Sequence, residues 1–160
     1  MDTIERAINQ WHNVKPGLDT EPLAIIGRMI RITKHLESEM AGLHKAHGLK
    51  PGEFDVLVSL FRSGQPHGLT PSDLIDAMIL SSGAMTNRLD KLETKGLIVR
   101  RHSETDRRSV KVQLTETGYK LINDILHEHI RLQQQLITQI NPSNRPELNK
   151  LLTEWLTQFE

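Results

Sequence analysis

The feature that most constrains this fold is a pair of closely spaced helices, followed at once by two strand-like runs, between residues 70 and 115. Thr70 is the predicted N-cap of the first helix, and Asp73 supplies a negative charge that favours a helix start. A tight turn at residues 81–83 leads into the second helix, which Gly96 closes. The first helix must therefore be short.

The strand-like runs lie directly after the second helix. Residues 97–102 are apolar at first, and residues 110–115 alternate strictly between apolar and polar side chains. The polar segment HSETDRRS between them is predicted to be a hairpin loop. A short helix, a tight turn, a second helix and a two-stranded hairpin form the layout of a winged helix-turn-helix. We therefore predict a mainly α-helical chain with a small β-hairpin wing.

Amphipathic helices flank this unit on both sides. Apolar residues spaced by three or four predict helices over residues 3–13 and 22–47, and Thr115 is the predicted N-cap of a helix that continues to about Ile140. The helix over 22–47 would be about 38 Å long, which is longer than one small lobe needs. The last helix carries an apolar stripe of Leu148, Leu151, Leu152, Trp155, Leu156 and Phe159.

A monomer of 160 residues has too little surface to cover that stripe, so the sequence favours a dimer. We predict that residues 1–48 and 116–160 form a helical dimerisation region. Residues 49–115 are predicted to form the winged helix-turn-helix lobe.

The composition is that of an ordinary globular chain, with 25% charged residues. The chain has no cysteine, which excludes disulfides and thiolate metal sites. No apolar run is long enough for a membrane span, and the acidic start does not resemble a signal peptide. The cytoplasm is therefore the expected compartment, and no membrane partner is expected.

The net charge of zero hides a local basic segment. Residues 86–111 contain eight lysines and arginines but only four acids, a surplus of +4 that the rest of the chain offsets. A localised basic element on a neutral body fits directed recognition of phosphate.

In a helix-turn-helix the second helix enters the major groove and its first residues meet base edges. Here that helix offers short hydroxyl and amide side chains and one lysine, whereas Arg107 and Arg108 at the hairpin tip fit a neighbouring narrow minor groove. Asp106 is expected to pair with Arg108 and hold the tip in one geometry. The predicted DNA-binding residues are Ser81, Ser82, Thr86, Asn87, Lys91, Asp106, Arg107 and Arg108.

The segment from Leu69 to Gly118 resembles the MarR family of bacterial transcriptional regulators, and the long flanking helices extend the likeness to nearly the whole chain. The resemblance implies a homodimer with interlocked terminal helices, whose two winged lobes bind a pseudo-palindromic operator. It rests on KLETKGLIVRR, on the D-x-R of Asp106 and Arg108, and on the LTxxG of Leu114, Thr115 and Gly118.

An extra helix at the start of the chain, which carries Trp11, narrows the resemblance to a urate-responsive subgroup, the PecS- and HucR-like regulators. By that likeness the ligand-binding residues are Trp11, Asp55, Arg88 and Arg100. A small anionic aromatic ligand such as urate suits an indole and a guanidinium. Arg100 is further expected to be the partner of Asp55 when no ligand is bound.

Structural roles remain open for the same residues. Trp11 on an amphipathic helix often serves packing, and Asp55 can supply charge to the first turn of its helix. Arg88 can instead contact phosphate directly.

Other function classes find little support in the sequence. There is no G-x-S-x-G motif, P-loop or paired-carboxylate pattern, so neither an enzyme nor a cofactor is predicted. His44 and His47 share a helix face but lack an evident third ligand, and no metal site is predicted. Two alternatives to a ligand-responsive regulator stay open: a constitutive architectural DNA-binding protein, and a winged-helix module that binds only proteins.

Overall fold

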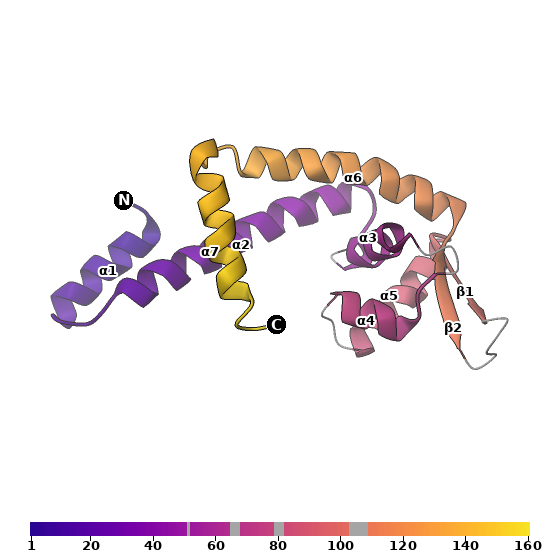
Figure 1. The fold of residues 1–160 in the computed structure, drawn as a ribbon, viewed down its shortest axis with the longest axis horizontal. Coiled ribbons are helices and arrows are strands. Elements are labelled where there is room, and N and C mark those ends of the chain that lie inside the picture. The colour runs from indigo at the N-terminus through magenta and orange to yellow at the C-terminus, as the bar shows by residue number, and fades with distance from the viewer. Residues whose placement is uncertain (51, 65–67, 79–81, 103–108) are drawn as a thin grey trace. The chain divides into compact units, whose positions relative to one another are not determined.

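The computed structural model describes residues 1–50, 52–64, 68–78, 82–102 and 109–160. The chain divides into two compact units, Met1–Leu43 and His44–Glu160. The described residues form mostly helices and one hairpin (Figure 1). The elements are α1 (Thr3–Val14), α2 (Glu21–Ala46), α3 (Glu53–Ser63), α4 (Pro71–Met78), α5 (Ser82–Thr94), β1 (Ile98–His102), β2 (Val110–Leu114), α6 (Glu116–Leu136), the 3-10 helix η1 (Pro142–Asn144) and α7 (Arg145–Leu156).

In the first unit α1 packs on the N-terminal half of α2. The side chain of Asp2 caps α1 by accepting a hydrogen bond of 2.7 Å from the Glu5 N–H. Ile4 lies over Gly27, where a side chain would crowd it. Arg28 then donates to Asp2 at 2.8 Å and to Glu5 at 2.9 Å, so that α2 and the start of α1 are joined by charge as well as by apolar contact.

The second unit is built around α3, which contacts α4, α5, α6 and β2 (Figure 1). Every one of these elements contributes apolar side chains to one core, and this burial is the main force that holds them together. The buried core residues are Leu49, Phe54, Val56, Leu57, Leu60, Leu74, Met85, Leu89, Leu92, Leu97, Ile98, Val112, Ile122 and Ile125.

The predicted hairpin is confirmed. β1 pairs antiparallel with β2, in a register that joins Ile98 to Leu114 and His102 to Val110. Leu69 adds an isolated bridge to the central residue Val112. The alternation seen in the sequence places Val112 in the core. The mainly α-helical winged helix-turn-helix is therefore the observed fold.

Two predicted helix starts are also confirmed. At α4 the Thr70 N–H donates to Asp73 at 2.8 Å, and the Asp73 N–H donates to the Thr70 hydroxyl at 3.1 Å. This reciprocal pair is a capping box with an acid in the third position. At α6 the hydroxyl of Thr115 accepts a hydrogen bond of 3.0 Å from the Gly118 N–H.

Gly118 explains the LTxxG motif. A side chain at this position would overlap the carbonyl oxygen of Leu97, because α6 begins directly against the residue that precedes β1. The Thr115 N–H donates to that same carbonyl at 3.1 Å, and the Thr115 hydroxyl donates to the Gly96 carbonyl at 2.7 Å. The motif therefore ties the wing to the helix that leaves the lobe.

The structure differs from the sequence-based bounds at the end of α6. The helix stops at Leu136 instead of about Ile140, and Ile137 takes φ −92° and ψ 0°. β-branched side chains are frequent in residues 137–140, and they disfavour a helix. Asn141 then caps η1 by accepting a hydrogen bond of 3.1 Å from the Ser143 N–H. Across the described helices, none combines the length and apolar character needed to cross a membrane.

Candidate functional site

α5 has two chemically distinct faces. One face is buried in the lobe against α3, α4 and β1, and the opposite face is exposed and polar. A helix held in this way can present its polar side chains to a partner without losing its packing. The buried face includes Met85, Leu89 and Leu92, and the exposed face includes the predicted DNA-binding residues Thr86, Asn87 and Lys91.

A hollow of about 280 Å³ lies along the second half of the exposed face of α5. Its lining includes Asn87 and Lys91, which were predicted to bind DNA, and three residues that were not. The lining residues described are Asn87, Asp90, Lys91, Thr94 and Lys95.

The other predicted DNA-binding residues fall at the margins of the described structure. Ser82 begins α5. Ser81, Asp106, Arg107 and Arg108 lie outside the described residues, as does the predicted pair between Asp106 and Arg108. The strands that lead to and from the hairpin loop are described and paired.

Arg100 does not have the predicted partner. Its guanidinium is bound by two carboxylates of α5, with Glu93 accepting a hydrogen bond of 2.9 Å and Asp90 accepting another. Glu93 also accepts from the Arg100 N–H at 3.1 Å. The prediction that Arg100 pairs with Asp55 when no ligand is bound is therefore wrong. The turn between α5 and β1 is tight, and it places Arg100 beside the carboxylates of Asp90 and Glu93 on α5.

This arrangement has an electrostatic consequence. The hydrogen bond to Asp90 raises the pKa of Arg100, and Glu93 adds to the effect. Arg100 is thus a fixed cation that braces the first strand of the wing onto α5.

Asp55 lies in the first turn of α3, and Arg88 reaches the residue before that turn from α5. The guanidinium of Arg88 packs against Gly52, which has φ +81° and precedes the helix, so that any side chain there would overlap it. Asp55 is exposed in the first turn. The Nη1 atom of Arg88 is buried, and no group in the described part of the chain accepts a hydrogen bond from it. A buried guanidinium nitrogen in this state is a site where an anion would be stabilised.

Trp11 belongs to the first unit, where it lies on α1 with 46% of its surface exposed. Packing within that unit therefore does not account for the whole side chain. The other three predicted ligand residues belong to the second unit.

Glu53 and Lys95 were not predicted as functional residues. Glu53 is 1% exposed, and its Oε2 accepts hydrogen bonds of 2.7 Å from Lys95 Nζ and 2.7 Å from the Lys50 N–H. Lys95 also donates to the Gly48 carbonyl at 2.9 Å. In the sequence Glu53 resembles any acid in a first helical turn, and only its burial distinguishes it.

The histidines form a second buried polar group. The rings of His44, His129 and Phe54 form a cluster in which each contacts the other two, with centroids 4.0 Å (His44–Phe54), 4.7 Å (Phe54–His129) and 5.4 Å (His44–His129) apart. His44 Nε2 lies 3.3 Å from His129 Nδ1. His47 points elsewhere and contacts Glu128 at 3.1 Å. Within the described ranges, no cluster of three or more metal-ligating side chains is found.

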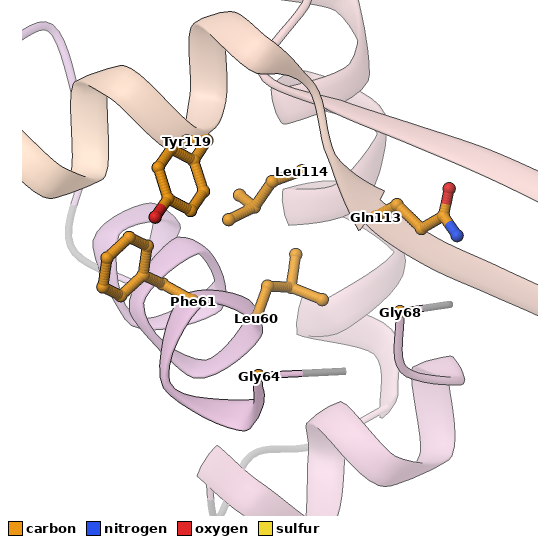
Figure 2. Close-up of a pocket in the computed structure, with 7 residues that line it drawn as sticks. All are labelled: Leu60, Phe61, Gly64, Gly68, Gln113, Leu114 and Tyr119. Carbon is orange, nitrogen blue, oxygen red and sulfur yellow. The ribbon is translucent and has the colours of Figure 1, made fainter. Parts of the chain in front are cut away.

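A separate cavity of about 300 Å³ opens at the base of the hairpin (Figure 2). Phe61 and Tyr119 form one side, with ring centroids 5.0 Å apart, and Gln113 and Leu114 of β2 lie on another. Its described lining carries no charged side chain, so this cavity lacks the cation that a small anion needs.

Comparison with known proteins agrees with this geometry. The family model described as the MarR family matches residues 49–110. The HTH-type transcriptional regulator PecS of Dickeya dadantii is 34% identical over 149 residues, which are 93% of this chain and 90% of that protein. The transcriptional repressor MprA of Escherichia coli K12 is 28% identical over an alignment of 136 residues that covers 82% of this chain and 77% of that protein.

The fold has close counterparts among solved structures. The crystal structure of AbsC, a MarR family transcriptional regulator from Streptomyces coelicolor, is similar with a TM-score of 0.76 and 24% sequence identity. The match covers 89% of this chain and 95% of that chain.

Proposed function

This chain belongs to the MarR family of transcriptional regulators, and from that premise we propose that it is a repressor that binds a pseudo-palindromic operator as a homodimer. A small anionic aromatic ligand such as urate would release it from DNA. The observation that carries the proposal is the exposed face of α5, where Thr86, Asn87 and Lys91 project away from a packed core. A hairpin follows directly, in the order that a winged helix-turn-helix requires.

The apolar surface of α7 supports the dimer. No residue of α7 is buried, although it carries Leu151 at 54% exposed and Trp155 at 38%. So much exposed apolar surface on one amphipathic helix is typical of an interface. We assign residues 1–48 and 116–160 to dimerisation, and residues 49–115 to the DNA-binding lobe. A two-fold dimer would present its two α5 helices to half-sites about 34 Å apart.

The position of Arg88 supports the proposal of an anionic ligand. Its Nη1 is buried without an acceptor among the described residues, so an anion that reaches it gains a charge-assisted hydrogen bond. Because Arg88 is part of α5, ligand binding acts directly on the helix proposed to contact DNA. A coupling of about 1–3 kcal/mol would weaken operator binding about 5- to 150-fold.

A gel-shift assay on the DNA upstream of the protein's own gene, with and without urate, tests both halves of the proposal. We expect a shifted band that weakens as urate is added. A salt titration of the same complex separates the alternatives, because affinity that depends on phosphate contacts falls steeply with salt. If no DNA binding is seen at low salt, the remaining alternative is a winged-helix module that binds only proteins. If all duplexes are bound with equal affinity, the remaining alternative is a constitutive architectural DNA-binding protein.

Calorimetry of urate with the DNA-free protein tests the ligand site alone. Arg88→Ala and Trp11→Ala should each abolish the measured heat, whereas Arg31→Ala, which removes an exposed arginine of α2, should leave it unchanged. Binding that none of the variants alters would exclude this site.

A further inference from the structure

Gly48 and Gly52, which lie between α2 and α3, and Glu53, the first residue of α3, hold α5 at two separate points. Arg88 packs against Gly52, and Lys95 donates to Glu53 and to the Gly48 carbonyl. The two cationic residues are seven positions apart, which is about two helical turns and ~10 Å along the axis. One anchor would leave a helix free to tilt about it, but two anchors at this separation define the direction of the axis.

Glu53 is the centre of the second anchor. Burial by itself raises the pKa of the Glu53 carboxyl, but the hydrogen bonds from Lys95 and the Lys50 N–H outweigh burial and bring the pKa below its usual value. The carboxylate is therefore ionised at neutral pH and holds Lys95 by a charge-assisted hydrogen bond of 2.7 Å.

Stability alone explains this arrangement poorly. The second oxygen, Oε1, is buried and finds no hydrogen-bond donor in the part of the chain that the structure describes. A buried acceptor without a donor is unfavourable, and a buried ion pair is often no more stable than apolar residues of the same size. The pair does, however, fix a helix end at a defined distance from the turn.

We propose that Glu53 is a positioning residue for DNA recognition: its buried carboxylate holds Lys95, and so sets the angle at which α5 presents Asn87 and Lys91 to the duplex. This inference rests on the proposed function. It also predicts how α5 moves when a ligand releases the protein from DNA. A ligand that moves Arg88 away from Gly52 leaves only the contact of Lys95, about which α5 then turns.

The test compares operator affinity in the full-length protein and in Glu53→Gln, which keeps the size of the side chain and removes its charge. Removing an acid makes the protein more positive, so electrostatics alone predicts equal or tighter DNA binding. Loss of the anchor predicts the opposite: affinity for the operator falls on the order of tenfold, with a smaller loss for a random duplex. Asp124→Asn, at an exposed position of α6, changes the net charge by the same amount and should not weaken binding.

The salt dependence distinguishes positioning from direct contact. Glu53→Gln should leave the slope of log affinity against log salt unchanged, because no phosphate contact is removed. Lys95→Met, the second variant, should show the same loss of affinity and the same slope. A slope that falls by about one in Lys95→Met would mean that Lys95 itself contacts phosphate, and would overturn the proposal.

Circular dichroism and thermal melting show whether each variant is folded, and Lys95→Met serves if Glu53→Gln is not. Equal or tighter operator binding by folded Glu53→Gln would also overturn the inference. The proposed function would fail separately, through absence of operator binding by the unaltered protein.

Discussion

His44 Nε2 lies 3.3 Å from His129 Nδ1, so the end of α2 and the middle of α6 are joined by a buried contact between two imidazoles. Such a contact needs one N–H and one free nitrogen lone pair, and two protonated rings cannot form it. Burial lowers the pKa of His44, and the neighbouring His129 lowers it further, although the charge of Asp55 opposes both. Burial lowers the pKa of His129 as well.

The protein should therefore lose stability as the pH falls below about 6.5, the value for histidine in an unfolded chain. Below that pH these histidines are protonated in the unfolded chain but stay neutral in the folded state, because folding lowers their pKa values. The free energy of unfolding therefore falls by at most ~1.4 kcal/mol per pH unit for each histidine. Urea unfolding at pH 7.5, 6.5 and 5.5, at one protein concentration, measures the slope of the free energy of unfolding against pH. His44→Gln should reduce it and His127→Gln, at an exposed position, should not; parallel slopes would contradict the prediction.

Arg100→Ala should loosen the wing. The variant removes the hydrogen bonds to Asp90 and Glu93, which fasten β1 to α5. Because the ion pairs are partly exposed, we expect a local loss of about 1 kcal/mol, seen as roughly fivefold faster amide hydrogen exchange in β1 and β2. Arg101→Ala removes the same charge from an exposed position of β1 and should leave exchange unchanged. Equal exchange in both variants would show that Arg100 is not a brace.

Gly118→Ala should destabilise the second unit. The added methyl group would overlap the Leu97 carbonyl, so α6 must shift away from the wing at a cost of about 2–3 kcal/mol. Gly42→Ala is the matched control in α2, where an added methyl group meets no atom within 4 Å. That change should be neutral or stabilise by up to ~1 kcal/mol, as expected for a glycine replaced by alanine inside a helix. Chemical denaturation measures both; similar values for the two glycines would be unexpected.

Leu151→Glu should weaken the proposed dimer. Leu151 is exposed on α7, and a carboxylate placed in an apolar interface would lose its hydration without gaining a partner. We expect a dissociation constant raised on the order of 100-fold, measured by light scattering or analytical ultracentrifugation. Lys150→Gln, at the neighbouring exposed position, should have little effect. A stable monomer in the unaltered protein would remove the basis for the dimer altogether.

Much of the fold could be predicted because its signals are local. The capping box of Thr70 and Asp73, the cap at Thr115 and the alternation that places Val112 in the core each depend on residues a few positions apart. The end of α6 was harder to predict, since a helix boundary depends on weak propensities around Ile137.

The features of the candidate site also separate into those that local sequence predicts and those that it does not. The sequence alone determined that α5 would carry an apolar face and a polar one, and that a hairpin would follow, because side-chain periodicity is a property of the chain itself. It did not determine which carboxylate each cation meets. Only the tertiary structure decided that Arg100 binds Asp90 and Glu93, and that Lys95 reaches a carboxylate 42 residues away at Glu53. Ionic attraction acts between any opposite charges that packing brings together, and one sequence offers many equivalent pairs until the core sets their distances.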